Sequence, residues 1–431
     1  MEKILILPSS SDLNRGDQAL VWETIRVAED SGFKGAFYLL GSETHRTEQS
    51  QKKGIRVLKP ILKHPSRMFK SKENNKYNLS LKIKWGIVSL FDFIFSLLLL
   101  CRWTRSLVKL FLGKNNTETL EVFEDVEACF VKGGGFIHSS GKLTDSYTVY
   151  FQLYHLMLAQ SLGKPVYVMP NSFGPFPGIG VKWLVNRTLN RCKIVTIRES
   201  ISQEMLEEID VHGDLYPDLG FSLTKANNEN HKINDIRKNY GGKKLVAITV
   251  RPYRFPNSIN PKEKYRNYID SIVKVSKWLS CNGYLPVFVE QVLSETSHES
   301  DINAIKEVVK FLDDGTYEVL ENANYSCEDL KYIYSKMDYT IGTRFHSVIF
   351  SISEGIPSIA IEYGGNKGAG ILRDMELSKL GIPIEEVTFE RLKNTFENLV
   401  KDEAKTKYKM DKYMQYVHSK RNELIYNVRK S

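Results

Sequence analysis

The chain has 431 residues, of which 42% are hydrophobic and 26% charged, and its formal net charge is +9. This length suits two domains of ordinary size, and the composition is that of a globular protein. The five cysteines are scattered and odd in number, without a Cys-x-x-Cys or Cys/His cluster. That pattern excludes a disulfide framework and a zinc site of the usual spacing, and it favours the reducing cytoplasm.

Strand-like and helix-like segments alternate along the first half of the chain. Residues 4–7 are an apolar run typical of a buried first strand, and they come too early for a signal peptide. The pattern continues with predicted strands at 37–40, 57–58, 128–131, 166–169 and 194–197, and with predicted helices at 17–31, 144–162, 181–190 and 202–209. It is interrupted between about residues 60 and 117, which we interpret as an insertion.

The second half restarts the same alternation after a polar segment, 227–244, which predicts an interdomain linker. Strands are predicted at 245–250, 285–290, 317–320, 337–341 and 358–361, and helices at 265–282, 303–312, 327–336 and 347–354. We therefore expect an α/β protein with two doubly wound Rossmann-like domains, 1–226 and 245–401, facing each other across a cleft. A last helix, 402–431, is expected to pack back on the first domain.

The segment from Gly342 to His346 follows an apolar run and opens a helix-like one. It should therefore lie at the carboxyl end of a strand, where open α/β sheets bind ligands. Arg344 can grip a phosphate or carboxylate with two parallel hydrogen bonds, and His346 is suited to proton transfer near neutral pH. The alternative is an arginine that caps the helix and a histidine that is simply packed.

Polar and glycine residues also follow the first strands. Asn14 and Asp17 lie between the first strand and its helix. Asp17 either caps that helix, which its residue type favours, or touches a substrate hydroxyl. Gly134 and Gly135 follow the strand at 128–131 and either let a ligand approach the backbone or form a plain loop.

Three more strand ends carry polar residues. Asn171 and Ser172 are expected to end the strand that begins at 166, with both side chains at the same sheet edge. Arg251 ends the first strand of the second domain, where exposure to the cleft is expected and an ordinary surface arginine is the alternative. Arg198 and Glu199 are expected to form a structural ion pair between the domains.

The order and spacing of these residues resemble the polysaccharide pyruvyl transferase family over nearly the whole chain. The matching residues are Asn14-Arg15-Gly16-Asp17, Gly133-Gly134-Gly135, Arg198-Glu199 with Ser202, Asp218, Arg251, Gly342-Thr343-Arg344-Phe345-His346 and Gly355-Ile356-Pro357. Gln18 stands where the family commonly has an acid, and Phe345 where it commonly has leucine. Residues 60–117 have no clear counterpart in the family pattern.

The resemblance implies a fold like that of glycosyltransferases of the B type and a reaction in bacterial capsule or exopolysaccharide synthesis. It implies phosphoenolpyruvate as donor, a sugar diol as acceptor and a cyclic pyruvate ketal as product. His346 would be the general acid, and Arg344 and Arg251 would bind the two anionic groups of the donor. Asp17, Asn14, Gly134, Gly135, Asn171 and Ser172 are the candidate acceptor-side residues. No metal and no cofactor beyond the co-substrate is expected.

The insertion concentrates the positive charge. Residues 51–114 contain fifteen Lys and Arg against two acids, a local charge of +13 that leaves −4 for the rest of the chain. Its apolar run, 85–101, contains Asp92 and has the following bases and tryptophans at its ends: Lys82, Lys84, Trp85, Arg102, Trp103, Arg105 and Lys109. These features predict docking in the headgroup region of an anionic membrane, without spanning it, and a buried core helix is the alternative.

Membrane docking suits an acceptor sugar carried on a polyprenyl lipid, at the cytoplasmic face of the plasma membrane. Three other functions remain open. A glycosyltransferase using a nucleotide sugar would need a carboxylate for the ribose, for which Glu362 is a candidate. A non-catalytic membrane-bound scaffold is disfavoured because Arg251, Arg344 and His346 are all present. Nucleic-acid binding is not expected because the aromatic residues lie within the apolar run and not between the bases.

Overall fold

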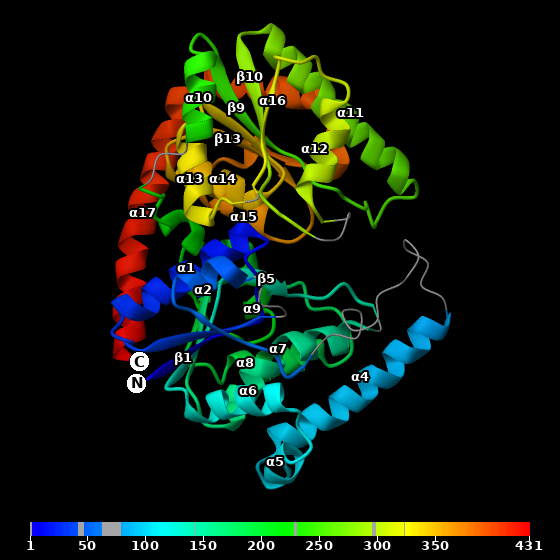
Figure 1. Ribbon diagram of the computed structural model, residues 1–431, viewed down its shortest axis with the longest axis vertical. Coiled ribbons are helices and arrows are strands. Elements are labelled where there is room, and N and C mark those ends of the chain that lie inside the picture. The colour runs from blue at the N-terminus through cyan, green and yellow to red at the C-terminus, as the bar shows by residue number, and fades with distance from the viewer. Residues whose placement is uncertain are drawn as a thin grey trace.

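The computed structural model describes residues 2–41, 47–62, 79–142, 144–227, 231–294, 299–322 and 324–431. It consists of two α/β domains, which form the lower and upper lobes in Figure 1. Each domain is built on a parallel sheet, and helices connect successive strands. The prediction of two doubly wound α/β domains is confirmed.

The first sheet has the strand order β3-β2-β1-β4-β6-β7-β8, and β5 pairs with β6. Its strands are β1 (Lys3–Leu7), β2 (Ala36–Leu40), β3 (Arg56–Leu58), β4 (Ala128–Val131), β5 (Gly134–Ile137), β6 (Val166–Phe173), β7 (Ile194–Ile197) and β8 (Asp214–Leu215). Most of these are apolar runs buried on both faces, as expected for a sheet covered by helices. The order reverses direction between β1 and β4, so the loops that follow these two strands diverge and leave room for a ligand.

The helices of this domain are α1 (Arg15–Asp30), α2 (Glu48–Lys52), α4 (Leu79–Leu100), α5 (Arg102–Lys109), α6 (Lys114–Asp125), α7 (Asp145–Ser161), α8 (Val181–Leu189), α9 (Ser200–Glu207) and the 3-10 turn η2 (Leu219–Ser222). Asn171 and Ser172 lie at the end of β6, as predicted, but the strand continues past residue 169 to Phe173. Gly134 and Gly135 follow β4, as predicted, but they lie in β5, which pairs with β6, and not in a plain loop. The added pairing partner lets β6 continue beyond its apolar run.

The second sheet has the order β11-β10-β9-β12-β13-β14. Its strands are β9 (Lys244–Thr249), β10 (Tyr284–Val289), β11 (Glu318–Leu320), β12 (Tyr339–Gly342), β13 (Ser358–Glu362) and β14 (Gly381–Pro383). The helices are α10 (His231–Asn239), α11 (Pro261–Cys281), α12 (Asp301–Val309), α13 (Cys327–Ser335), α14 (Phe345–Ser353), α15 (Lys367–Asp374), α16 (Phe389–Lys401) and α17 (Glu403–Lys430), with 3-10 turns η3 (Ser378–Leu380) and η4 (Ile384–Glu386). Here too the chain order reverses, between β9 and β12.

The segment predicted as a linker contains a helix. Ile233 and Ile236 of α10 are three residues apart and buried, and Arg237 pairs with Asp338 at 3.0 Å. Helix α10 therefore packs on the second domain, and the connection between the domains is shorter than residues 227–244. The polar composition of this segment reflects an amphipathic helix with a narrow apolar face.

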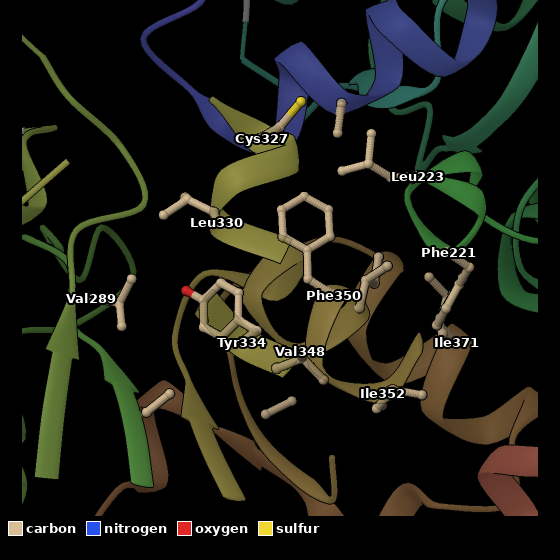
Figure 2. Packing of buried hydrophobic residues seen from close by; sticks show 14 of the residues in the cluster. Phe221, Leu223, Val289, Cys327, Leu330, Tyr334, Val348, Phe350, Ile352 and Ile371 are labelled. Atoms are coloured by element: carbon tan, nitrogen blue, oxygen red, sulfur yellow. The ribbon is translucent and has the colours of Figure 1, made fainter. Parts of the chain in front are cut away.

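The two domains are packed together on one side by a continuous apolar interface. Figure 2 shows Phe221 and Leu223, from the region of η2, beside Phe350 of α14 and Leu330 of α13, and all four side chains are buried. Helix α17 runs along both lobes in Figure 1 and contacts α1 as well as α14 and α16. On this side the domains do not form an open cleft.

Candidate active site

The loop after β1 and the start of α14 meet at the domain interface. A Cβ added to Gly16 would lie 1.9 Å from Nδ1 of His346, so the imidazole occupies the space that a side chain at position 16 would need. Backbone hydrogen bonds from Arg15 to Gln291 (3.4 Å) and from Leu293 to Leu13 (2.9 Å) hold the same loop to the second domain. Two motifs that are far apart in the sequence thus form one site.

Asn14, and not Asp17, caps helix α1. Its Oδ1 accepts hydrogen bonds from the backbone N–H groups of Gly16 (3.0 Å) and Asp17 (3.4 Å). The expectation that Asp17 is the cap is wrong, because Asn14 precedes the helix and has the extended backbone that a capping residue needs. The carboxylate of Asp17 is thereby available for other contacts.

Asp17 pairs with a lysine that ends β4. Its Oδ1 lies 3.1 Å from Nζ of Lys132, and its Oδ2 accepts a hydrogen bond from Nδ2 of Asn14 at 3.0 Å. Burial alone would raise the pKa of Asp17, but the nearby Lys132, His346 and Lys367 outweigh that effect and lower it. Asp17 is therefore an ionised carboxylate at neutral pH, placed next to the His346 imidazole.

A second carboxylate, Asp218, lies at the centre of the site and is completely buried. It follows β8 and is fixed by a hydrogen bond from the backbone N–H of Gly220 at 2.8 Å. Nη1 of Arg198 lies 2.9 Å from Asp218, Nζ of Lys367 lies 3.4 Å away, and Nε2 of His346 lies 3.9 Å away. Burial would raise the pKa of Asp218, yet Lys367 and Arg198 hold it well below its usual range.

His346 and Lys367 form a close pair of titratable groups, with 3.0 Å between Nζ of Lys367 and Nε2 of His346. Burial and the ammonium of Lys367 lower the pKa of His346 to about 3. Burial also lowers the pKa of Lys367 to about 7, against the opposing pull of Asp218. Near neutral pH the proton of this pair therefore resides on Lys367, and Lys367 can release it readily.

Lys367 is the residue of this cluster that sequence reasoning missed most clearly. It begins α15 after Gly364 and Gly365, which both have positive φ (56° and 77°) and follow the end of β13. This is another strand–turn–helix unit at the carboxyl end of a strand, so the Gly-Gly pair was the available signal. The far end of α15 is anchored on the first domain, where Asp374 accepts hydrogen bonds from the backbone N–H and hydroxyl of Ser200.

Arg198, Glu199 and Ser172 form a buried network behind Asp218. Nε of Arg198 donates to Oγ of Ser172 at 2.7 Å, and that hydroxyl donates to Oε2 of Glu199 at 2.8 Å. Arg198 and Glu199 are 3.5 Å apart, as expected for the predicted ion pair, but the shorter contact of Arg198 is with Asp218. A Cβ on Gly135 would lie 3.0 Å from Nη2 of Arg198, so this glycine gives the guanidinium its place.

The amide of Asn171 is used within the first sheet. Its Nδ2 donates to the carbonyls of Lys132 (2.9 Å) and Met169 (2.8 Å). A Cβ on Gly134 would lie 3.5 Å from Oδ1 of Asn171 and 2.9 Å from the Phe136 ring. These two residues shape the backbone next to Lys132, and their predicted contact with an acceptor stays a prediction.

The two arginines predicted to bind the donor have different surroundings. Arg344 is buried, and its Nε and Nη2 both contact Oδ1 of Asp301, at 2.9 and 2.6 Å. Arg251 instead stacks on the Tyr363 ring at 3.9 Å and forms no ion pair with any residue in the described part of the chain. The positive charge of Arg251 is therefore available to bind an anion, whereas that of Arg344 is already paired with the carboxylate of Asp301.

Within the described ranges, no three His, Cys, Asp or Glu side chains gather as a metal site would require. Each carboxylate of the cluster around His346 faces a cation instead. The expectation that the reaction needs no metal or cofactor stays a prediction.

The fold is similar to that of sugar-nucleotide enzymes. The UDP-GlcNAc 2-epimerase of Neisseria meningitidis matches with a TM-score of 0.55 at 12% identity, covering 100% of both chains. A glycosyltransferase from Rickettsia africae matches with a TM-score of 0.53 at 11% identity, covering 100% of this chain and 96% of its own. Anabaena Alr3699/HepE, solved with UDP and glucose, matches with a TM-score of 0.52 at 9% identity, covering 97% and 95%. At these identities the likeness shows the fold alone, which is the predicted glycosyltransferase-B type.

Sequence comparison shows the family. The amylovoran biosynthesis protein AmsJ of Erwinia amylovora is 25% identical over 248 residues, which are 55% of this chain and 58% of AmsJ. The chain thus spans little more than half of that relative. The profile of the family described as polysaccharide pyruvyl transferase matches residues 14–365, which include both motifs that meet at Gly16 and His346. Because this match covers most of the chain, the protein belongs to the polysaccharide pyruvyl transferase family.

Proposed function

We propose that this protein transfers a pyruvyl group from phosphoenolpyruvate to a sugar diol of a bacterial surface glycan, forming a cyclic ketal and releasing phosphate. The observation that carries the proposal is that the His346–Lys367 pair of the second domain lies against Gly16, next to Asp17 of the first domain, whose pKa both groups lower. It joins an ionised carboxylate to a proton-carrying lysine–histidine pair. A ketal-forming transfer needs both a base and an acid at one place.

The cations suit a donor with a phosphate and a carboxylate. Lys367 lies in the first turn of α15, where backbone N–H groups and the helix dipole favour an anion. Arg251 adds a planar guanidinium held by stacking on Tyr363, without an ion pair to a described residue. We assign the donor's anionic groups to Lys367 and Arg251. Arg344, neutralised by Asp301, positions the loop that carries His346.

The proton transfers of the reaction can be assigned to the Lys367–His346 pair and to Asp17. A proton from the Lys367–His346 pair is added to C3 of phosphoenolpyruvate, which becomes a methyl group and leaves C2 as an electrophilic oxocarbenium centre. The first sugar hydroxyl adds to C2 and loses its proton to Asp17. The C2–O bond to phosphate breaks, and phosphate leaves with that bond's electron pair and takes up the proton held by Asp17. The second hydroxyl then adds to C2, which closes the ketal ring and returns a proton to the Lys367–His346 pair. The negative donor raises the proton affinity of His346, which then acts as general acid.

The acceptor and its carrier follow from the same proposal. A polyprenyl-linked sugar at the cytoplasmic face of the plasma membrane would bring the diol to Asp17 on the first-domain side. Asn14 orients the Asp17 carboxylate through a hydrogen bond of 3.0 Å. Lys132 keeps that carboxylate ionised, and Ser172 supports Arg198 behind the site.

The second candidate is a glycosyltransferase that uses a nucleotide sugar. It is favoured by Glu362, which ends β13 at the sheet edge where a ribose could bind, although burial raises the pKa of this carboxyl group. Thermal unfolding separates the two donors. Phosphoenolpyruvate should raise the unfolding temperature, whereas uridine and guanosine diphosphate sugars should not.

The decisive experiment is mass spectrometry of lipid-linked glycans incubated with the protein and phosphoenolpyruvate. We expect a mass increase of one ketal-linked pyruvyl group and an equal amount of released phosphate. Addition of a sugar residue from a nucleotide sugar, without any pyruvylated product, would contradict the proposal. A protein that does neither with a range of glycans would favour the scaffold.

A further inference from the structure

Helix α4 carries its apolar side chains on the face that points away from the protein. Six of them lie between 38% and 69% exposed: Ile87, Leu90, Phe91, Ile94, Leu97 and Leu98. At 3.6 residues per turn they fall within one stripe about 120° wide. Exposed apolar surface gathered in this way marks an interaction site.

The opposite face of α4 packs on α7 through polar as well as apolar groups. Oγ of Ser96 and the hydroxyl of Tyr150 are 2.7 Å apart, and the Phe93 ring lies 4.8 Å from the Tyr150 ring. Leu99 is fully buried, and burial raises the pKa of Asp92. A helix that covers a soluble core turns its apolar face inward, whereas α4 turns most of its apolar side chains outward and buries polar ones such as Ser96.

By length and composition, the segment 83–100 could cross a membrane, with a mean hydropathy of 1.9 and only 11% of it buried. Its attachment to α7 argues for a different arrangement. Nη2 of Arg105, in α5, donates to Oγ of Ser161 at the end of α7 (2.8 Å), and Nε of Arg105 donates to the Leu99 carbonyl (2.8 Å). Arg105 thus ties the α4–α5 junction to α7, and Ser96 and Phe93 contact Tyr150 of α7 within α4, so α4 lies along the globular domain. Figure 1 shows α4 and α5 at the margin of the lower lobe.

Helix α5 extends the exposed apolar surface. Trp103 is 90% exposed, and Leu107, Leu110 and Phe111 are exposed as well. We call the outer side of α4 together with these four residues the α4–α5 face. A tryptophan at its edge is typical of segments that lie at the boundary between headgroups and acyl chains.

The bases around this face are divided between two roles. Arg105 is engaged by Ser161, and Lys109 pairs with Glu124 at 2.9 Å. Lys84 and Arg102 are exposed and form no ion pair with a residue in the described ranges. Among the described bases next to this face, Lys84 and Arg102 are therefore the ones available, and the apolar side chains should supply most of the binding.

We propose that the α4–α5 face docks on an anionic lipid bilayer, with α4 lying in the headgroup region parallel to the membrane plane. Charge favours lipid over a second copy of the chain, because a symmetric dimer through this face would place Lys84 and Arg102 near the same bases of its partner. Anionic headgroups complement those bases, and acyl chains cover the apolar stripe. The inference concerns a surface separate from the catalytic cluster and does not depend on the reaction.

The test is co-sedimentation of the full-length protein with vesicles of phosphatidylglycerol and phosphatidylcholine, without donor or acceptor. We expect the protein to pellet with the vesicles, and Phe91→Gln/Leu98→Gln/Trp103→Gln to lower the partition coefficient at least about tenfold. Raising the salt should weaken binding, because it screens Lys84 and Arg102, each of which contributes at most about fivefold. It should not abolish binding, because the apolar contacts do not depend on salt. The matched control is Ile259→Gln/Phe311→Gln/Tyr408→Gln, which removes three exposed apolar side chains outside the α4–α5 face and should bind like the unmodified chain.

Three outcomes would overturn the inference. The first is an unmodified protein that stays in the supernatant at low salt, and the second is a triple variant of the α4–α5 face that pellets as well as the control. The third is an oligomer, seen by sedimentation velocity without lipid, that the triple variant no longer forms, while neither protein binds vesicles. That result would make a second copy of the chain the occupant. Because vesicle binding is measured without turnover, it is distinguishable from failure of the proposed reaction.

Discussion

Gly16 and His346 are in direct contact across the domain interface, and the imidazole fills the volume next to the Gly16 Cα. A Cβ at this position would lie 1.9 Å from Nδ1 and 2.5 Å from Cγ of His346. No real side chain tolerates such distances, so the first domain fixes where the His346 imidazole of the second domain can lie. The lack of a side chain at Gly16 is therefore what lets the imidazole occupy this place.

Gly16→Ala should consequently reduce pyruvyl transfer by about a hundredfold or more, because a displacement of about 1 Å at a reacting group costs that much. Turnover is measured by phosphate release. The control is Gly242→Ala, since a Cβ on Gly242 meets nothing within 4 Å. If Gly16→Ala is folded and as active as this control, the contact has no role in positioning His346.

His346→Ala should abolish turnover while phosphoenolpyruvate affinity changes by less than about tenfold. The reason is that proton transfer stabilises the transition state much more than the bound donor. Calorimetry gives the affinity, and single-turnover phosphate release gives the rate. Normal turnover by a folded His346→Ala protein would assign the proton to Lys367 alone.

The two arginines should separate into a binding and a positioning role. Arg251→Ala should weaken phosphoenolpyruvate binding by about 1.5–3 kcal/mol, the usual effect of losing a hydrogen bond to a charged group, with little change in stability. Arg344→Ala leaves the buried Asp301 without its partner and should lower the free energy of unfolding by about 3–5 kcal/mol.

Arg344→Ala combined with Asp301→Asn removes both charges of that pair and should recover part of the lost stability. Chemical denaturation measures stability, and calorimetry measures donor affinity. Equal losses of affinity in Arg251→Ala and in the stable double variant would place Arg344 in direct contact with the donor, as first predicted from the sequence.

Lys367 should make stability rise with pH above neutrality. Burial lowers the pKa of Lys367 in the folded protein from its ordinary value of 10.5 to about 7, so between these two pH values the unfolded chain binds more protons than the folded one. The free energy of unfolding should therefore increase from pH 7 towards pH 10, by at most about 1.4 kcal/mol per pH unit. Denaturant titrations at several pH values measure this slope.

Lys367→Met removes the titrating group and should flatten the slope. Lys409→Met is the matched control, because it removes a lysine outside the cluster that pairs with Glu376 at 3.4 Å. A slope that persists in Lys367→Met belongs to another group. A wild-type slope of zero would mean that the ammonium of Lys367 is as well stabilised in the fold as in water.

Much of this organisation was predictable because it depends on short-range patterns. Apolar runs and glycine turns located strands such as β12 and β13 and placed His346 at a strand end. The partners of these residues were not predictable. Asp301 neutralises Arg344 although the two residues are 43 positions apart, and no local sequence pattern predicts that pairing. The polarity of residues 227–244 likewise concealed two isoleucines of α10, because only one face of that helix is apolar.

The same limit applies to Asn171 and Ser172. The apolar run predicted a strand at 166–169 that these two residues end, but β5 supplies a pairing partner with which β6 extends to Phe173. Lys367 was overlooked for a different reason. A single lysine is ordinary in sequence, and only the approach of Asp218 and His346 from two other strand ends makes it unusual.

The position of α17 affects how the protein is made. Nη2 of Arg429 donates to the backbone carbonyl of Asp30 at the end of α1, although the two residues are 399 positions apart. At about 5–20 residues per second, ~20–80 s of translation separate these partners. During that time the first domain must persist on the ribosome with the α17-facing side of α1 uncovered. The α4–α5 face is synthesised early in this interval, so its apolar side chains leave the ribosome before the fold is complete.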